Sequence, residues 1–336
     1  MSNGVVRQGA IAAVIVLLLA GAFSYVRLPH APVITAPTLA HAAEMDLRDR
    51  PPRGPGPAVS GPPAIPRVVL GAATNSQVVA LTFDLDMDEQ MAAAARGGAV
   101  WINGDALTYL ESRKLHATLF MTGMWAEVYP ALAREIASNP NFEIGDHSYS
   151  HPAFHTPCYL LGGVSRAEQA RQIQLAQKAI ERPTGVLPKY FRFPGGCYDR
   201  PALDLVQAAG LIPVQWNVNS IDAFNSYPQQ IVSTVLSEVK PGSIVVMHLN
   251  GGSNAPSTGL ALRLLIPELE KRGYQFLTVS ELLATGTPIQ PADGQREVSE
   301  FYQPPPPPPP PPLPVKPTPR WCGWVIGLHG RVWVCR

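Results

Sequence analysis

Short apolar runs alternate with amphipathic stretches between residues 68 and 290 of the 336-residue chain. Five of the runs are interpreted as buried strands: VVALTF (Val78–Phe83), HATLFMTG (His116–Gly123), KYFRF, LIPVQWNV and SIVVMH. Helical periodicity predicts helices between and after the later strands, at Leu203–Ala209, Gln229–Glu238 and Leu260–Arg272. Because parallel strands need crossover connections, this alternation predicts a parallel α/β sheet or barrel.

One helix start is also predicted from the sequence, because Ser165 and Glu168 have the spacing of a capping box before a helix that runs to about Ile180. In parallel α/β folds the reactive side chains lie at the carboxyl ends of the strands. We therefore expect functional residues directly after the apolar runs.

The N-terminal segment, residues 1–28, is an export signal in this interpretation. A single cation, Arg7, precedes the uncharged apolar run Ala10–Val26, which suits either a signal-peptide core or a membrane span. The small-residue site Ala40–Ala42 lies far beyond that run, so we favour an uncleaved anchor over a cleaved signal peptide. Either interpretation places the rest of the chain outside the cytosol, in the periplasm or cell envelope. We expect the N-terminal segment to anchor the chain in the inner membrane.

Proline-rich segments border the predicted domain 68–290 on both sides. Residues 29–67 are rich in Pro, Gly and Ala and suit a spacer. Residues 291–320 contain nine consecutive prolines, Pro304–Pro312, which favour a stiff rod or a docking ligand. The tail, residues 321–336, is aromatic and bracketed by cysteines, and it suits either a small disulfide-closed hairpin or a poorly ordered end.

Composition narrows the class of protein. The formal net charge is +1 and only 15% of residues are charged, with no clustered basic run, which argues against nucleic-acid binding. The four cysteines form no CxxC pair, so a zinc-ribbon site is not expected. In an exported protein the simplest of three possible pairings is Cys158–Cys197 with Cys322–Cys335, and free thiols are the alternative.

Candidate chemistry follows the predicted strands. Asp84, Asp86 and Asp88 come directly after the first strand, where carboxylates suit metal ligation or general base catalysis. His147 and His151 follow a later apolar run, with His155 four residues further on, and a spacing of four places two imidazoles on one face of a helical turn. One carboxylate and two imidazoles, with positions left for water, indicate a catalytic rather than a structural metal site.

Three more strand ends carry polar residues. Arg192 is near the end of KYFRF, Asp222 follows LIPVQWNV, and His248 ends SIVVMH. Each has an ordinary structural explanation when taken alone. Together with the Asp and His clusters they indicate an active site.

In this order, the five segments resemble the motifs of the polysaccharide deacetylase family, also called the NodB-homology domain or carbohydrate esterase family four. The resemblance covers about residues 75–290 and implies a deformed (β/α) barrel with one divalent metal, for which zinc is expected. It also implies roles: Asp84 as catalytic base, His248 as general acid, and Arg192 and Asp222 as the residues that set their protonation. His147 and His151 would bind the metal, and the Gly195 N–H would help to bind the oxyanion.

The chain also departs from the family pattern. The position of the ligating Asp is Leu85, so we expect Asp86 to supply the oxygen ligand, with Asp88 as the alternative. Gly195 replaces an aromatic residue, and Asn219 and Ala223 replace an Asp and a Trp. We expect an active N-deacetylase of a GlcNAc-containing polysaccharide such as peptidoglycan. The alternatives are an O-acetyl esterase and a non-catalytic glycan- or metal-binding module.

Overall fold

A curled, mainly parallel β-sheet forms the centre of the computed structural model, which describes residues 68–291, 322–327 and 330–335. Its parallel strands follow the order β8–β2–β3–β4–β5–β6. Their bounds are β2 Val78–Leu85, β3 Ala117–Met121, β4 Phe142–Asp146, β5 Tyr190–Phe191, β6 Ile212–Pro213 and β8 Ser243–His248. The predicted parallel arrangement is confirmed.

Short strands complete the curl into the deformed barrel that the family resemblance implies. β7 (Val218–Asn219) pairs with β8, and β9 (Gln275–Phe276) pairs with β2. β1 (Gly71–Ala73) lies antiparallel between β8 and β10 (Thr287–Ile289). An isolated bridge from Val69 to Val214 joins this edge to the residue that follows β6.

The prediction of one continuous strand over LIPVQWNV was wrong. This segment changes partners along its length, because Ile212 and Pro213 pair with β5 whereas Val214 pairs with Val69. The Gln215 N–H then donates to the Val69 carbonyl before β7 begins beside β8. The segment therefore forms two short strands, β6 and β7.

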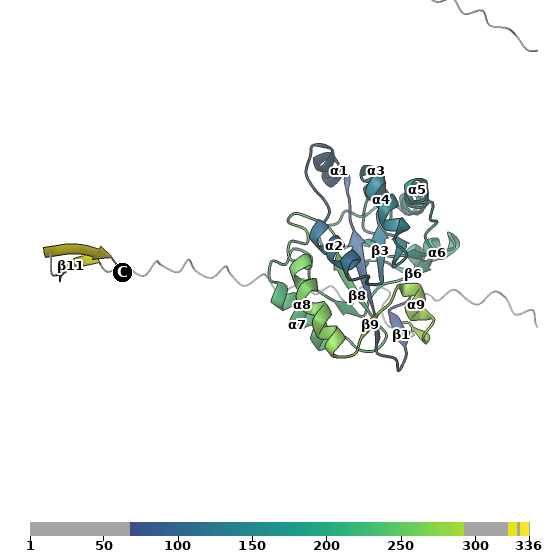
Figure 1. The fold of residues 1–336 in the computed structure, drawn as a ribbon. Helices are drawn as coiled ribbons and strands as arrows, with labels where there is room; N and C mark the ends of the chain where they lie inside the picture. Colours follow the sequence, from purple (N-terminus) through teal and green to yellow (C-terminus); the bar gives the residue numbers. More distant parts are fainter. Residues whose placement is uncertain (1–67, 292–321, 328–329, 336) are drawn as a thin grey trace, which may run out of the picture. The chain divides into compact units, whose positions relative to one another are not determined.

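Helices cover the outside of the sheet (Figure 1). Their bounds are α1 Glu89–Arg96, α2 Gly104–Ser112, α3 Gly123–Val128, α4 Pro130–Ser138, α5 Arg166–Thr184, α6 Arg200–Ala208, α7 Pro228–Glu238, α8 Thr258–Lys271 and α9 Val279–Leu283. The predicted start of α5 is confirmed, since the Ser165 hydroxyl accepts the Glu168 N–H at 3.3 Å.

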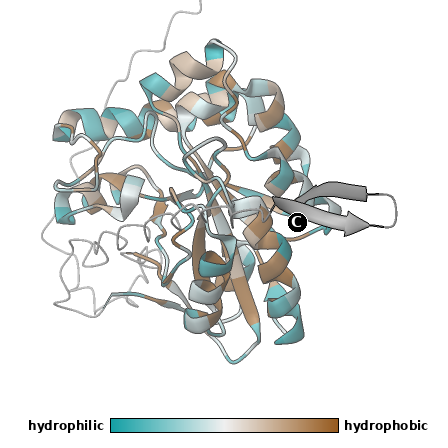
Figure 2. Cartoon of the chain, turned by 90° about the vertical axis from the view of Figure 1, so that its left-hand side faces the viewer, coloured by the Kyte–Doolittle hydropathy of each residue, from teal (hydrophilic) through white to brown (hydrophobic). Residues whose placement is uncertain are grey.

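Alternation along the strands separates two apolar clusters, and Figure 2 shows the apolar strands enclosed by helices with hydrophilic outer faces. In β2 the odd-numbered Leu81, Phe83 and Leu85 belong to the large cluster beneath the helices. The even-numbered Val78 and Ala80 belong to the cluster inside the curl. Because side chains alternate along a strand, every even position of β2 has the inner orientation.

The remaining sequence predictions concern the two ends. β11 (Cys322–Gly327) and β12 (Gly330–Cys335) form an antiparallel hairpin whose register pairs Cys322 with Cys335, so the predicted backbone hairpin is present. Segment 1–28, spacer 29–67 and residues 292–320 of the linker lie outside the described residues. None of the helices in the described part of the chain has the length and apolar character that a membrane crossing requires.

Candidate active site

The carboxyl ends of the parallel strands bring the predicted site residues together. β2 ends beside Asp84 and Asp86, β4 is followed by His147, and β8 ends in His248. Arg192 comes directly after β5, and its N–H donates to the Asp146 carbonyl at the end of β4. The sheet therefore gathers residues that are more than 160 positions apart in the sequence at one rim.

Asp86, His147 and His151 form a compact group of possible metal ligands. Asp86 Oδ1 lies 3.3 Å from His147 Nε2 and 3.4 Å from His151 Nε2. Asp86 and His147 are buried, and the His151 side chain is 13% exposed. Two imidazole nitrogens and one carboxylate oxygen are a donor set that suits zinc and similar divalent metals.

The burial and the hydrogen bonds of these donor atoms suit a metal ion. Asp86 Oδ1 is buried and has no hydrogen-bond partner in the described structure. The Nδ1 of His147 lies 2.9 Å from the Arg192 carbonyl, so Nδ1–H donates there and leaves the Nε2 lone pair facing Asp86. Metal-binding histidines characteristically use their second nitrogen in this way. A buried oxygen without a donor is otherwise costly, so the group is suited to a cation.

Strand alternation explains why Asp86 and not Leu85 reaches this group. Leu85 is one of the odd-numbered residues of β2, and its side chain is fully buried in the large cluster beneath the helices. Asp86 is the next residue, so its side chain has the inner orientation. Asn250 fixes its backbone, because the Asp86 N–H donates to Asn250 Oδ1 at 2.9 Å. Asp88 instead caps helix α1, where Asp88 Oδ1 accepts the Met91 N–H at 2.7 Å. The geometry therefore favours Asp86 over Asp88.

The expectation that His147 and His151 share a helical turn was wrong, because the two residues lie on a loop after β4. Ser148 and His151 adopt left-handed backbone conformations, with φ of 66° and 62°. The His151 N–H donates to the Ser148 hydroxyl at 3.1 Å, which closes a tight turn. The imidazole rings still meet, with centroids 4.9 Å apart.

A buried ion pair joins Arg192 to Asp84. Arg192 Nη1 donates to Asp84 Oδ1 at 2.7 Å, and the arginine is fully buried. The guanidinium lies 4.0 Å from the centre of the Phe120 ring and also donates to the backbone carbonyl of Gln215. Burial lowers the pKa of Arg192, and Asp84 opposes that change. The pair leaves Asp84 Oδ2 on the side of His147, at 3.6 Å from its Nε2.

A second pair joins Asp222 to His248. Asp222 Oδ1 lies 2.8 Å from His248 Nδ1, and Asp222 Oδ2 accepts the His248 backbone N–H at 2.8 Å. Hydroxyls of Ser220 and Thr258 complete the carboxylate's bonds. Burial alone would lower the pKa of His248, but Asp222 and the more distant Asp86 outweigh it and raise the pKa to about 10. His248 is therefore protonated at neutral pH.

Burial has the opposite net result at His151. Desolvation lowers the pKa of His151 to about 4, with His147 adding to the effect and Asp86 opposing it. Burial would raise the pKa of Asp86, but the imidazoles of His151 and His147 outweigh it and lower that pKa. A neutral imidazole beside an ionised carboxylate is the state that metal binding requires.

Comparisons with known proteins show the family of the chain. The sequence profile described as polysaccharide deacetylase matches residues 71–214. A peptidoglycan-N-acetylglucosamine deacetylase of Bacillus cereus is 30% identical over 211 residues, an alignment that covers 62% of this chain and 89% of that protein. The chain belongs to the polysaccharide deacetylase family.

Solved structures similar to this chain include a deacetylase and a pseudoenzyme. A peptidoglycan N-acetylglucosamine deacetylase structure has a TM-score of 0.56 at 26% identity, covering 67% of this chain and 96% of its own. A CE4 family pseudoenzyme from Bacillus anthracis has a TM-score of 0.54 at 26% identity, covering 65% and 69%. The uncharacterised YlxY protein of Bacillus subtilis is 29% identical to this chain over an alignment that covers 53% of the chain. The same alignment spans about half (51%) of the YlxY protein.

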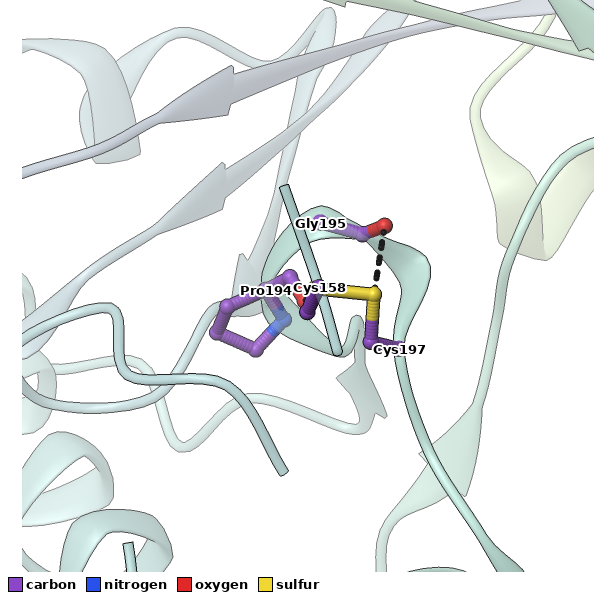
Figure 3. The surroundings of a disulfide bond; sticks show 4 residues. All are labelled: Cys158, Pro194, Gly195 and Cys197. Carbon is purple, nitrogen blue, oxygen red and sulfur yellow. Dashed lines mark hydrogen bonds between the residues drawn. A yellow bond between two sulfur atoms is a disulfide. The ribbon is translucent and has the colours of Figure 1, made fainter. Parts of the chain in front are cut away.

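A disulfide holds the segment that follows Arg192 in this deacetylase domain. Cys158 and Cys197 are bonded, as the simplest pairing predicts, with Cα atoms 5.9 Å apart. Figure 3 shows the bond against the turn that carries Pro194 and Gly195. Gly195 has a φ of 60°, a conformation that glycine adopts without strain. The third histidine, His155, does not join the metal group and instead lies 3.3 Å from Asp199.

Three supporting residues were missed by the sequence interpretation. Asn250 holds Asp86, and Gln172 of helix α5 accepts the N–H groups of Tyr149 and Ser150 in the histidine loop. Asp146 is fully buried and accepts the Ser148 N–H, and burial raises its pKa well above the usual value. Nothing in the sequence near Asn250 or Gln172 indicates these contacts. A charged residue ending an apolar strand was the only signal for Asp146.

Proposed function

We propose that this chain is a metal-dependent N-deacetylase of a polysaccharide that contains N-acetylglucosamine. The observation that carries the proposal is the unpartnered Asp86 oxygen between two imidazole nitrogens, flanked by the Arg192–Asp84 and Asp222–His248 pairs. This arrangement combines a candidate cation site with one carboxylate, Asp84, and one protonated imidazole, His248. Amide hydrolysis needs these three functions: an electrophile, a base and an acid.

Asp86, His147 and His151 would hold one divalent metal, for which zinc suits the donor set. When bound, such a metal supplies Lewis acidity, which polarises an acyl carbonyl and makes water more acidic. The protein keeps the required protonation states, because His151 is neutral and Asp86 is ionised. The Gly195 N–H, on the turn after Arg192, is the donor that we assign to the oxygen of the acyl group.

Asp84 is suited to accept a proton from the attacking water. Arg192 occupies Oδ1 and leaves Oδ2 facing the metal group. Because the guanidinium is buried and bonded to Oδ1, it fixes the orientation of the carboxylate. The water oxygen forms a bond to the acyl carbon while its proton passes to Asp84.

His248 is suited to donate a proton to the leaving nitrogen. Asp222 binds Nδ1, so Nε2 carries the proton that faces the site, and Nε2 lies 3.9 Å from Asp86 Oδ2. The carbon–nitrogen bond breaks as the nitrogen takes this proton. The products are a free amino sugar and acetic acid, which ionises to acetate. The proton on Asp84 is returned to solvent, and His248 takes up a proton from solvent, so both residues regain their starting states.

Relatives and the disulfide support the proposed substrate and compartment. The curated relatives include peptidoglycan-N-acetylglucosamine deacetylases and chitooligosaccharide deacetylases. Disulfides such as Cys158–Cys197 persist in oxidising compartments outside the cytosol. Together with the apolar run Ala10–Val26, they support an exported enzyme attached to the inner membrane and acting in the cell envelope.

Two other functions have specific support. A family 4 acetyl xylan esterase from Clostridium thermocellum has a TM-score of 0.50 at 26% identity, which favours an O-acetyl esterase as the second candidate. The similarity to a CE4 pseudoenzyme, together with Leu85 at the usual ligand position, favours a non-catalytic module as the third.

Acetate release separates the three functions. The purified chain is incubated with N-acetylated and O-acetylated oligosaccharides, with and without a chelator, and bound metal is measured by mass spectrometry. The N-deacetylase requires chelator-sensitive acetate release from the N-acetylated substrates. Release from the O-acetylated substrates alone would support the esterase, and no release from either would support the non-catalytic module.

A further inference from the structure

The turn after β7 brings Asp222 to the end of β8. β7 runs parallel to β8 with Asn219 opposite Val246, and the Ser220 N–H donates to the Val246 carbonyl at 3.3 Å. Two residues further along β8, the His248 N–H donates to Asp222 Oδ2 at 2.8 Å. The carboxylate therefore takes the place that a backbone carbonyl of a parallel neighbour would occupy. Its position depends on the turn that follows β7.

That turn contains an unfavourable backbone conformation. Ile221 has a φ of 57°, in the left-handed region. Crowding around the Cβ atom makes this region unfavourable for a β-branched residue, and such a conformation persists only where the surrounding structure holds it. Glycine would adopt the same conformation without strain. An isoleucine at this position therefore requires contacts that stabilise the turn.

Side-chain oxygens of the two preceding residues supply such contacts. Asn219 Oδ1 accepts the Ile221 N–H at 2.9 Å. The Ser220 hydroxyl accepts the Asp222 N–H at 3.2 Å and donates to Asp222 Oδ1 at 3.0 Å. In both turns a side-chain oxygen takes the role of a backbone carbonyl. The Asn219 bond acts directly on the left-handed residue, whereas the Ser220 bonds act on the residue that carries the carboxylate.

We propose that Asn219 is a positioning residue for the Asp222–His248 pair: by holding Ile221 in the left-handed conformation, it brings the carboxylate onto two N–H groups of the histidine. These are the Nδ1–H and the backbone N–H of His248, and both contacts measure 2.8 Å. A displacement of Asp222 would therefore weaken both together. The inference rests on the proposed function, because a catalytic consequence requires His248 to be the general acid.

The bond between Asp222 and His248 can be observed without catalysis. An imidazole N–H that donates to a carboxylate forms a short, charge-assisted bond and gives a proton NMR signal at low field. In the metal-loaded full chain, loss of the signal in His248→Gln assigns it. Asn219→Ala is expected to move the signal to higher field, whereas Asn219→Asp, which keeps an acceptor oxygen, retains it. Asn225→Ala is the matched control, because Asn225 Oδ1 accepts the Tyr227 N–H at 2.8 Å in the same loop.

A double variant tests how Asn219 acts. In Asn219→Ala/Ile221→Gly, glycine adopts the left-handed conformation without the Asn219 bond, so the signal should return to its position in the parent. For acetate release from N-acetylated oligosaccharides, Asn219→Ala is expected to lower kcat about tenfold with KM and metal content unchanged, because a misplaced acid contributes less to the chemical step. The double variant should recover kcat to within about twofold of the parent.

The outcomes separate this inference from the proposed function. An unchanged signal in Asn219→Ala would overturn the inference, as would equal shifts in Asn219→Ala and Asn225→Ala or a double variant that stays shifted. Absence of the low-field signal from the parent would also overturn it. The expected signals in a chain that releases no acetate would support the positioning by Asn219 and overturn the proposed function. Acetate release with an unchanged kcat in Asn219→Ala would do the reverse.

Discussion

Two carboxylates inside the same barrel have very different surroundings. Near the start of β4, Glu143 accepts hydrogen bonds from the Thr118 hydroxyl and from the hydroxyl and N–H of Ser280 at the start of α9. At the other end of the strands, Asp86 has a buried oxygen without any donor in the described structure. The protein supplies all the partners of Glu143 itself.

This difference separates structural from functional polar groups. Glu143 has hydrogen bonds to both of its oxygens and joins α9 to the sheet. Asp86 is left short of a partner where two imidazole nitrogens also converge. Under the proposed function, the carboxyl end of the barrel would carry the chemistry, and the polar contacts at the amino end would serve stability. Four substitutions test this contrast.

The largest effect is expected at Asp84. The Asp84→Asn change removes the proton acceptor but leaves an amide oxygen that still accepts from Arg192. We expect kcat to fall about 1000-fold, and the melting temperature to fall as well because the buried Arg192 loses its charged partner. Acetate release at saturating substrate measures kcat, and calorimetry measures melting. A variant that kept more than a tenth of the activity would exclude Asp84 as the base.

The next effect is expected at Asp86. The Asp86→Asn change weakens metal affinity by about 100-fold or more, because it replaces an anionic ligand by a neutral one. The matched control is Asp88→Asn, which keeps the cap of α1 since Asn caps helices as well as Asp does. Metal content after dialysis and calorimetric titration give the result. A greater loss in Asp88→Asn would show that the ligand assignment is wrong, and His147→Ala should abolish stoichiometric binding.

A smaller change is expected in the pH profile of Asp222→Asn. Asp222 raises the pKa of His248 to about 10, so the acid form persists to alkaline pH. Without the carboxylate that pKa falls, and the alkaline limb of kcat/KM moves to lower pH. Thr258→Val, which removes one hydrogen bond but no charge, should move the limb less. An alkaline limb that stayed in place in Asp222→Asn would exclude His248 as the general acid.

The smallest functional effect is expected at Glu143. The Glu143→Gln change disturbs the bonds to Thr118 and Ser280 and should lower the free energy of unfolding by about 1–3 kcal/mol. Both kcat and metal content should stay as in the parent chain. Urea unfolding and acetate release test these outcomes. Loss of metal in this variant would break the contrast between the two ends of the barrel.

Much of this arrangement could be predicted from local patterns. Asp84, His147, Arg192 and His248 do lie at the carboxyl ends of strands at one rim, and β8 has the bounds of the SIVVMH run. The period-two alternation in TFDLDMD is enough to place Asp84 and Asp86 on one face and Leu85 on the other. The same alternation explains why residue 86 and not residue 85 supplies the expected ligand, because the side chain at position 85 faces the large cluster beneath the helices.

Other features depend on contacts that a local pattern does not contain. The spacing of His147 and His151 is typical of a helix, but left-handed backbone at Ser148 and His151 makes the turn a loop. Asn250 reaches Asp86 across 164 residues, and Gln172 lies 22 residues beyond Ser150. The break between β6 and β7 follows from pairing with Val69, far away in the chain.

The Gln172 side chain has a consequence for the exchange of backbone hydrogens. The N–H groups of Tyr149 and Ser150 donate to this one side-chain oxygen rather than to a neighbouring strand. Their protection from solvent deuterium therefore depends on α5 keeping its register, and not on the sheet. A local opening of α5 would release these two amides together, so their exchange rates would report how often the histidine loop loses its support.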